Sequence, residues 1–250
     1  PPDSGFQLTY RFEIKEKIPN QIWLVLERPD LYTVTCNGKP VPPPSGWWLD
    51  RSFGKIDITG LVKVGENLVT ATASPMTMLH EAAAAYVLGE FSVTPAEKGF
   101  VITPPQDLHV GEGWNAQGCP LYPGRVAYRT TVQKSRADGR WLVRLGAWNG
   151  SVAQVLVNDT PAGVIYRPPY GCEITPLLKD GENEIAVVVT GTLKNTLGPH
   201  HAGTIRGSAW PHAFAQGPAE GPPPGTAYDT IAYGLFEPFR IVRQEVQESR

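Results

Sequence analysis

A spacing of 116 residues, from Asp57 to Glu173, separates two copies of one pattern in this chain of 250 residues. The first copy reads Asp57-Ile58-Thr59 and then Gly65-Glu66-Asn67, and the second reads Glu173-Ile174-Thr175 and then Gly181-Glu182-Asn183. Solenoid repeats are shorter, roughly 20–50 residues. The spacing therefore predicts one supersecondary plan that is used twice, once in each of two domains.

Hydrophobic alternation with a period of two marks the strands of both copies. Apolar and polar residues alternate from Phe6 to Ile14, and again from Val126 to Val132, as expected for half-buried strands. The 26 glycines and 25 prolines fall into no low-complexity run, so they supply turns between many short strands. We predict an all-β fold made of two tandem β-sandwich domains.

A proline-rich stretch without periodicity sets the expected domain boundary at Pro95, Pro104 and Pro105. The alanines at 82–85 favour a short helical turn just before the last strand of the first domain. The predicted organisation is a first domain over 1–95, a linker over 96–108 and a second domain over 109–250 that contains a long loop at 193–226.

Charge and hydropathy exclude two classes of partner. The formal net charge is −2 and no basic run is present, so we expect no binding to nucleic acid. No stretch has the roughly 18 consecutive apolar residues that a membrane-spanning helix needs. The start of the sequence also lacks a signal peptide, so we expect an excised fragment of a larger protein.

The three cysteines, Cys36, Cys119 and Cys172, are too few and too scattered for a disulfide scaffold. They are expected to be buried small apolar residues. A bridge between Cys119 and Cys172 stays open, because sequence alone cannot supply the geometry that a disulfide needs. No cysteine and histidine spacing indicates zinc.

The second copy carries a family resemblance. Its residues are Val155–Asn158, Tyr170–Thr175 and Leu178–Ile185. They resemble the galactose-binding-like jelly roll that binds sugars in family 2 glycoside hydrolases and in the accessory domains of bacterial rhamnosidase-like enzymes. Asp159 replaces the family's glycine and Glu173 its aspartate, and both changes are mild. The resemblance covers residues 109–244 firmly and residues 6–94 loosely.

The resemblance implies a role without catalysis. In such proteins the catalytic unit is usually a separate barrel, and this sequence shows no alternation of helices with parallel strands. We therefore expect a pair of carbohydrate-binding modules from a larger bacterial, secreted glycoside-hydrolase-like protein, placed outside the cell or in the periplasm. Its expected partners are a polysaccharide and the parent chain's catalytic domain.

Two alternatives remain at this point. The domains could act only as a structural buttress for that catalytic domain, or the chain could be an unrecognised glycoside hydrolase. Carboxylates are available for hydrolysis, for example Glu27, Glu81 and Glu237, but none lies in an acid/base motif. No cofactor is implied with certainty, although the resemblance allows a structural calcium ion.

Sugar recognition needs exposed aromatic faces beside polar side chains. In the first copy, Trp47 and Trp48 stand beside Asp50 and Arg51 in a loop that follows three prolines. This cluster is the first candidate carbohydrate site. The alternative is that one tryptophan closes the core while Asp50 and Arg51 pair locally.

Further candidates lie in the second copy. Tyr166 and Arg167 occupy the corresponding loop, and Trp148 is expected to expose its ring at a hairpin turn. His200 and Trp210 belong to the long loop at 193–226, and loops of that length are often functional. The adjacent His200 and His201 would need His212 as a third ligand to hold a metal, so the metal site stays unknown.

Overall fold

A computed structural model describes residues 3–135, 139–198, 200 and 221–244. It is almost entirely β, which confirms the predicted fold class. Two compact units divide the chain: unit 1 comprises 1–106 with 221–226, and unit 2 comprises 107–220 with 227–250. Each unit has its own hydrophobic core between two sheets.

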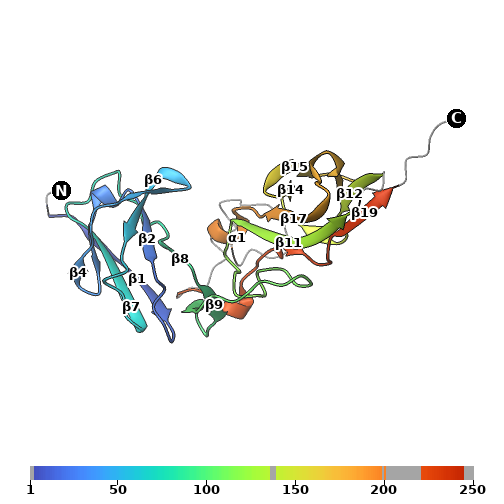
Figure 1. Cartoon of the computed structure of the whole chain (residues 1–250). Coiled ribbons are helices and arrows are strands. Elements are labelled where there is room, and N and C mark those ends of the chain that lie inside the picture. The colour runs from blue at the N-terminus through green and yellow to red at the C-terminus, as the bar shows by residue number, and fades with distance from the viewer. Residues whose placement is uncertain (1–2, 136–138, 199, 201–220, 245–250) are drawn as a thin grey trace. The chain divides into compact units, whose positions relative to one another are not determined.

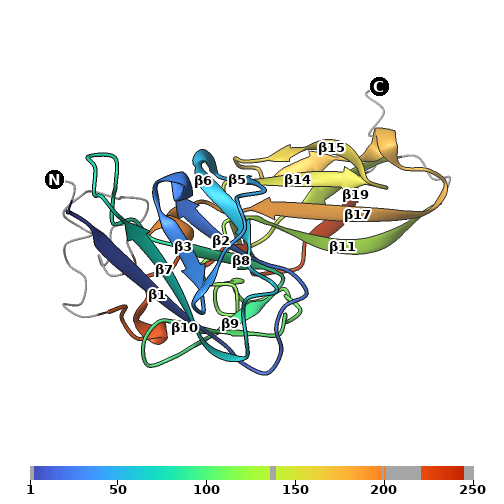
Figure 2. The same ribbon diagram turned by 90° about the vertical axis from the view of Figure 1, so that its left-hand side faces the viewer.

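Unit 1 is a β-sandwich of ten strands (Figure 2). The larger sheet has the order β4-β3-β7-β1-β10-β9 and the smaller sheet has the order β5-β6-β2-β8. The bounds are β1 Phe6–Ile14, β2 Ile22–Glu27, β3 Thr33–Cys36, β4 Lys39–Pro40, β5 Gly46–Trp48, β6 Asp50–Asp57, β7 Gly65–Ala73, β8 Tyr86–Gly89, β9 Ser92–Pro95 and β10 Phe100–Thr103, with the 3-10 helix η1 at Pro29–Leu31.

Unit 2 repeats this plan with fewer strands. Its sheets have the orders β11-β17-β14-β15 and β16-β12-β19, and β13 pairs with β18. The bounds are β11 Arg125–Lys134, β12 Arg140–Arg144, β13 Trp148–Asn149, β14 Val152–Val157, β15 Thr160–Ile165, β16 Gly171–Glu173, β17 Gly181–Thr190, β18 Gly234–Leu235 and β19 Arg240–Gln244, with η2 at Thr175–Leu177 and α1 at Lys194–Leu197. The 3-10 helix η3, Gly225–Ala227, begins in the segment 221–226 of unit 1 and ends at the first residue after it.

The sequence repeat corresponds to a hydrogen-bonded turn that is built the same way in both units. In unit 1 the Asn67 side chain is fully buried, accepts the Lys63 N–H at 2.8 Å and donates to the carbonyls of Lys63 and Gly65. The Asn37 amide donates to Asn67 at 2.9 Å and accepts the Leu68 N–H at 3.0 Å. These bonds tie the β3–β4 turn to the start of β7.

Unit 2 contains the same network with different residue numbers. Asn183 accepts the Lys179 N–H and donates to the carbonyls of Lys179 and Gly181, while Asn158 donates to Asn183 at 2.9 Å and accepts the Glu184 N–H. Asn37 and Asn158 both have positive φ, near 50°. The predicted repeat is thus present as a shared set of hydrogen bonds, and its asparagines have a structural role.

Two local expectations differ from the structure. The segment 96–108, assigned to a linker, contains β10, which pairs with both β1 and β9. A strand of four residues that is followed directly by Pro104 is too short to show periodicity in the sequence. The expected helical turn at the alanines is also wrong, because residues 80–85 have no helix and run directly into β8. Tertiary contacts override the weak helix propensity there.

Candidate functional site

The smaller sheet of unit 1 has an unusual outer surface. Along β2, Ile22, Leu24 and Leu26 point into the core. Residues that alternate with these point to the opposite side of the sheet, so Trp23, Val25 and Glu27 lie on the outer surface. Val25 has 0% exposure although it is no part of the core cluster. Something other than the core therefore covers it.

The cover consists of side chains from neighbouring strands. Residues directly opposite on adjacent strands share a face of the sheet, and Val25 lies between Lys55 on β6 and Tyr86 on β8. Glu27 lies opposite Phe53, and the Trp48 ring packs on Tyr86. We call this surface the aromatic face and define it by Trp23, Val25, Glu27, Trp48, Phe53, Lys55 and Tyr86.

Three of the four rings of the aromatic face are in contact, with Tyr86 between Trp48 and Phe53. The centroids of Trp48 and Tyr86 are 5.2 Å apart, and those of Phe53 and Tyr86 are 6.1 Å apart in an edge-on arrangement. The Lys55 ammonium lies 3.7 Å from the centroid of the Trp23 ring, which is a cation–π contact. All four rings are half-buried, so part of each is in contact with solvent.

Polar groups accompany these rings. Burial raises the pKa of the Tyr86 phenol, and the negative charge of Glu27 raises it further. The phenol therefore keeps its proton at neutral pH and can donate a hydrogen bond. Together the aromatic face offers apolar ring surface, a phenol donor, a carboxylate acceptor and an ammonium donor within one sheet surface.

The same positions in unit 2 carry other residue types. Strand β2 of unit 1 corresponds to β12 of unit 2. Trp23 of β2 lies opposite Asp57 and Leu88, and Leu142 of β12 lies opposite Glu173 and Val242, so Trp23 corresponds to Leu142. By this register Val25 and Tyr86 correspond to Arg144 and Arg240. The shared fold therefore does not require aromatic residues on this surface.

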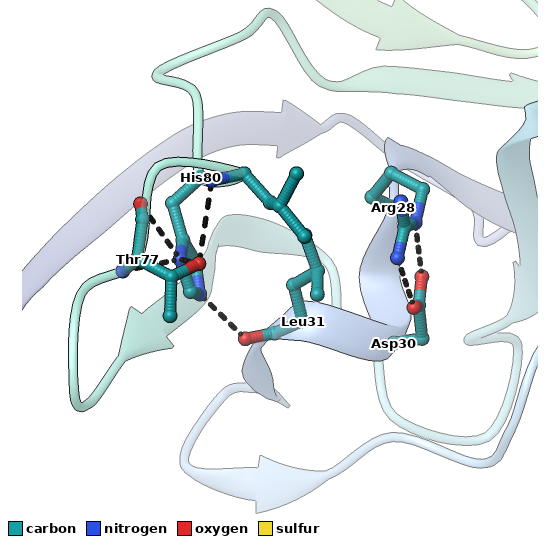
Figure 3. Close-up of polar contacts among 6 residues, drawn as sticks. Arg28, Asp30, Leu31, Thr77 and His80 are labelled. Carbon is teal, nitrogen blue, oxygen red and sulfur yellow. Dashed lines mark hydrogen bonds and ion pairs between the residues drawn. The ribbon is translucent and has the colours of Figure 1, made fainter.

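The loop before β8 positions Tyr86, and its anchor is His80 (Figure 3). The Thr77 N–H donates to His80 Nδ1 at 3.0 Å, so this nitrogen carries a lone pair and the ring proton is on Nε2. His80 Nε2 then donates to the Leu31 carbonyl at 2.9 Å. The neighbouring ion pair between Arg28 and Asp30 holds the turn that precedes Leu31.

Two tyrosines hold the remainder of this loop against the larger sheet. The Tyr32 hydroxyl donates to the Glu81 carbonyl and the Tyr10 hydroxyl donates to the Ala83 carbonyl, each at 2.8 Å. Tyr32 also contacts the His80 ring edge-on, with centroids 5.0 Å apart. The path of the chain into β8 is therefore fixed by side chains of β1, His80 and Tyr32.

The structure separates the four residues predicted for unit 1. Trp48 lies on the aromatic face, whereas Trp47 lies opposite Gly54 on the other side of the β5–β6 hairpin and is 57% exposed. Asp50 accepts hydrogen bonds from the Ser52 N–H and hydroxyl, which lower the pKa of the Asp50 carboxyl. Arg51 is exposed. Neither Asp50 nor Arg51 contributes to the aromatic face as defined above.

In unit 2 the predicted residues belong to two separate contacts. Trp148 packs edge-on against Tyr170 with centroids 5.6 Å apart, and its ring is half-buried, not fully exposed, because β13 pairs with β18. Tyr166 is 61% exposed, and the Arg167 guanidinium lies over its ring. Both contacts therefore include an exposed tyrosine, Tyr170 in the first and Tyr166 in the second.

The third predicted cluster is only partly described. His200 packs on Tyr228 with ring centroids 5.0 Å apart. Trp210, His201 and His212 lie outside the described residues. In the part of the chain that the structure covers, no group of three or more metal-ligating side chains comes together.

All three cysteines are free thiols, so the Cys119–Cys172 bridge that the sequence left open is not formed. Burial raises the pKa of the Cys36 and Cys172 thiols. In the described ranges, no helix is long and apolar enough to span a bilayer.

The sequence missed Trp23, Phe53 and Tyr86. Trp23 stands in the run Ile22–Leu26, which is apolar throughout, so alternation could not assign it to an outer surface. Tyr86 follows alanines that suggested helix. The register of β6 and β8 against β2 was the missing information, and no sequence signal supplied it.

Comparison with known proteins places the chain's similarities among glycoside hydrolases. No protein-family model matches. A stretch of 92 residues, 34% of the chain, is 30% identical to a "Putative beta-glucuronidase" from Formosa agariphila and covers 8% of that protein. The chain thus corresponds to a small part of this relative.

Solved structures give weaker likenesses. A rhamnosidase from Novosphingobium sp. PP1Y aligns with 97% of the chain and 22% of its own length, at 18% identity and a TM-score of 0.39. A glycosyl hydrolase family 2 member from Bacteroides cellulosilyticus aligns with 76% of the chain and 24% of its own length, at 12% identity and a TM-score of 0.26. These scores are too low to transfer a function.

Proposed function

We propose that this chain is a non-catalytic carbohydrate-binding part of a larger glycoside-hydrolase-like protein, and that the aromatic face of unit 1 holds the glycan. Half-buried rings offer the flat apolar surface on which the C–H faces of sugar rings stack. The Tyr86 phenol, Glu27 and Lys55 are placed to bind hydroxyl groups beside those rings. The galactose-binding-like character of the units belongs to the same proposal.

One observation carries this proposal. The two units share a turn network and a sheet register, yet among the described residues an aromatic layer covers the smaller sheet in unit 1 alone. A layer that only stabilised the fold would be expected in both units. Rings kept half-exposed on one unit are better explained by binding a ligand.

The aromatic face extends along β2. Trp23 and Glu27 are four residues apart on β2, which is about 13 Å along a strand. This length suits roughly two to three sugar rings of a continuous chain better than a single terminal sugar. Contacts on an open surface give modest affinity, because polar groups stay partly hydrated.

A second candidate function is that of a structural accessory unit. It is favoured by the outer surface of the larger sheet of unit 2, where Leu156, Val164 and Val188 are partly exposed. The corresponding surface of unit 1 carries threonines, for example Thr35 and Thr70. An apolar sheet surface of this kind suits contact with another folded domain.

The test compares Trp48→Ala and Tyr86→Ala with Trp47→Ala in a binding screen against soluble polysaccharides. Trp47 is a matched control, since it is adjacent, of the same type and more exposed. We expect each aromatic-face variant to weaken binding about tenfold, which corresponds to about 1.4 kcal/mol. We expect no change for Trp47→Ala.

Other outcomes would discriminate between the candidates. Tyr86→Phe keeps the ring, so it should retain most binding if stacking dominates. Absence of binding to any glycan by the unchanged protein would favour the structural function. New reducing ends after incubation with a glycan would contradict the non-catalytic proposal.

A further inference from the structure

The smaller sheet of unit 2 places two arginines side by side on its outer surface. Val143 of β12 and Leu145, the residue directly after β12, both belong to the core. Arg144 therefore points outward, and it lies directly opposite Arg240 of β19. Directly opposite residues of an antiparallel pair have Cα atoms roughly 4.5–5.5 Å apart. Like charges at such a position repel each other and destabilise a sheet.

The neighbouring strand does not relieve this repulsion. On the other side of Arg144 lies Gly171 of β16. A Cβ atom at Gly171 would be 2.8 Å from Arg144 Nη1, so the guanidinium lies over the bare glycine backbone. The absence of a side chain at Gly171 leaves room for Arg144 and also leaves its surroundings open.

The acidic residues described near these arginines do not form ion pairs with them. Glu173, the nearest acidic residue on β16, is bound to Arg140 at 2.5 Å. The Glu237 carboxylate lies over Gly146, two residues beyond Arg144, and makes no ion pair with either arginine. Among the described residues neither Arg144 nor Arg240 forms an ion pair.

The fold does not require this pair. In unit 1 the corresponding positions hold Val25 and Tyr86, an uncharged pair in the same register. A cross-strand pair of like charges costs stability, and unit 1 lacks such a pair at this position. This difference indicates that the pair has a function in unit 2. The Arg144 guanidinium lies over β16 and Arg240 stands on β19, so an oxyanion above β12 would be flanked by two multiply donating guanidinium groups.

We infer that Arg144 and Arg240 form an anion-binding site for the acidic group of a glycan, either the carboxylate of a uronate or a sulfate ester. This inference rests on the proposed function, because it assigns the second unit to the same class of ligand. The aromatic face supplies stacking for sugar rings, and the arginine pair supplies selectivity for acidic chains.

The test uses the full chain and calorimetric titration at low salt with three probes: oligogalacturonate, a sulfated oligosaccharide and an uncharged oligosaccharide of equal length. The variants are Arg144→Gln, Arg240→Gln and, as the control, Arg125→Gln. Arg125 is exposed, belongs to the same unit and lies on the other sheet. We expect about a tenfold loss of affinity for an acidic probe with each of the first two variants. The control variant should keep its affinity for both acidic probes. A loss for oligogalacturonate identifies the carboxylate as the bound group, and a loss for the sulfated oligosaccharide identifies the sulfate.

The stability of the unliganded protein provides a second readout. Arg240→Gln removes the repulsion, so its melting temperature should equal or exceed that of the unchanged protein. A marked loss of stability would show that the pair is structural and would overturn the inference.

Two failures can be told apart. Equal loss with Arg125→Gln, or an unchanged affinity for both acidic probes, overturns the arginine site alone. If the uncharged probe binds and Trp48→Ala abolishes that binding, the proposed function stands regardless. If no probe binds the unchanged protein, the proposed function itself fails.

Discussion

Asn67 and Asn183 each hold a turn together with a side chain that is almost completely buried. Each amide uses its oxygen and both hydrogens in bonds to backbone or to a second asparagine. A buried amide whose partners are all in place is costly to remove, because the partners lose their bonds and cannot reach water.

We predict that Asn67→Ala destabilises unit 1 and Asn183→Ala destabilises unit 2 by similar amounts, about 2–4 kcal/mol each. Each variant leaves one backbone N–H and two carbonyl oxygens without their partner. Chemical denaturation monitored by circular dichroism measures the loss. A loss below about 0.5 kcal/mol in either variant would contradict this account of the repeat.

Asn67→Asp provides a pH-dependent control. The new carboxylate would face the carbonyl oxygens of Lys63 and Gly65, so burial and repulsion favour its protonated form. The pKa of that carboxyl in the folded state would lie above its unfolded value. The stability of Asn67→Asp should therefore be greater at acidic pH and fall as the pH rises through the folded pKa.

At the scale of elements, the segment from Ser74 to Ala85 is a long connection without helix or strand that is tied down by a few side chains. His80 uses both ring nitrogens, and Tyr32 and Tyr10 fix the residues that follow. Met76, Met78 and Leu79 remain exposed on it. Its order therefore depends on polar anchors and ring contacts more than on burial.

We predict that His80→Ala loosens this connection without unfolding unit 1. The Thr77 N–H and the Leu31 carbonyl lose their bonds to the ring, at a cost of about 1–2 kcal/mol in local opening. Hydrogen exchange at the Glu81 amide, which donates to the Tyr32 hydroxyl, should accelerate about tenfold. His109→Ala, at an exposed histidine of unit 2, should leave this exchange rate unchanged.

The sequence predicted a strand correctly where one side of that strand is exposed to solvent. β1 alternates along its whole length and was found from that alternation. β2 is apolar on both sides, because the other side chains of the aromatic face cover Val25. The sequence pattern therefore could not identify its outer residues. The sequence pattern also missed β10, because its four residues, which end just before Pro104, are too few to show a period.

At the scale of the whole molecule, the chain contributes a late segment to the early unit. Residues 221–226 belong to unit 1, although the sequence placed them in the second domain. The Gly99 N–H donates to the Pro223 carbonyl and the Gly225 N–H donates to the Ala96 carbonyl. Gly225 is buried, and a Cβ atom there would collide with the Gly99 carbonyl.

We predict that Gly225→Val displaces this segment from the β9–β10 turn. Overpacking of this kind costs about 1–3 kcal/mol. The Gly99 amide should lose its protection against hydrogen exchange while the β1 amides keep theirs. Thr226→Val, one residue further along at an exposed position, is the matched control and should leave Gly99 protected.

The sequence by itself determined the plan of this protein: an all-β chain, one pattern used twice, and asparagine turns at the same place in each copy. Such features are encoded locally, because alternation sets the buried side of a strand and positive φ selects asparagine or glycine at a turn. Trp48 was identified as a candidate from the same local signals.

Only the tertiary structure decided which surface is aromatic and which is cationic. Trp23, Phe53 and Tyr86 are far apart in the sequence and meet because β6 and β8 pair with β2 in one register. Arg144 and Arg240 are brought to one face of the smaller sheet of unit 2 in the same way, because β19 pairs with β12 in one register. Cross-strand register depends on the packing of both sheets around a core, and a shift of one residue would turn each of these side chains to the other face.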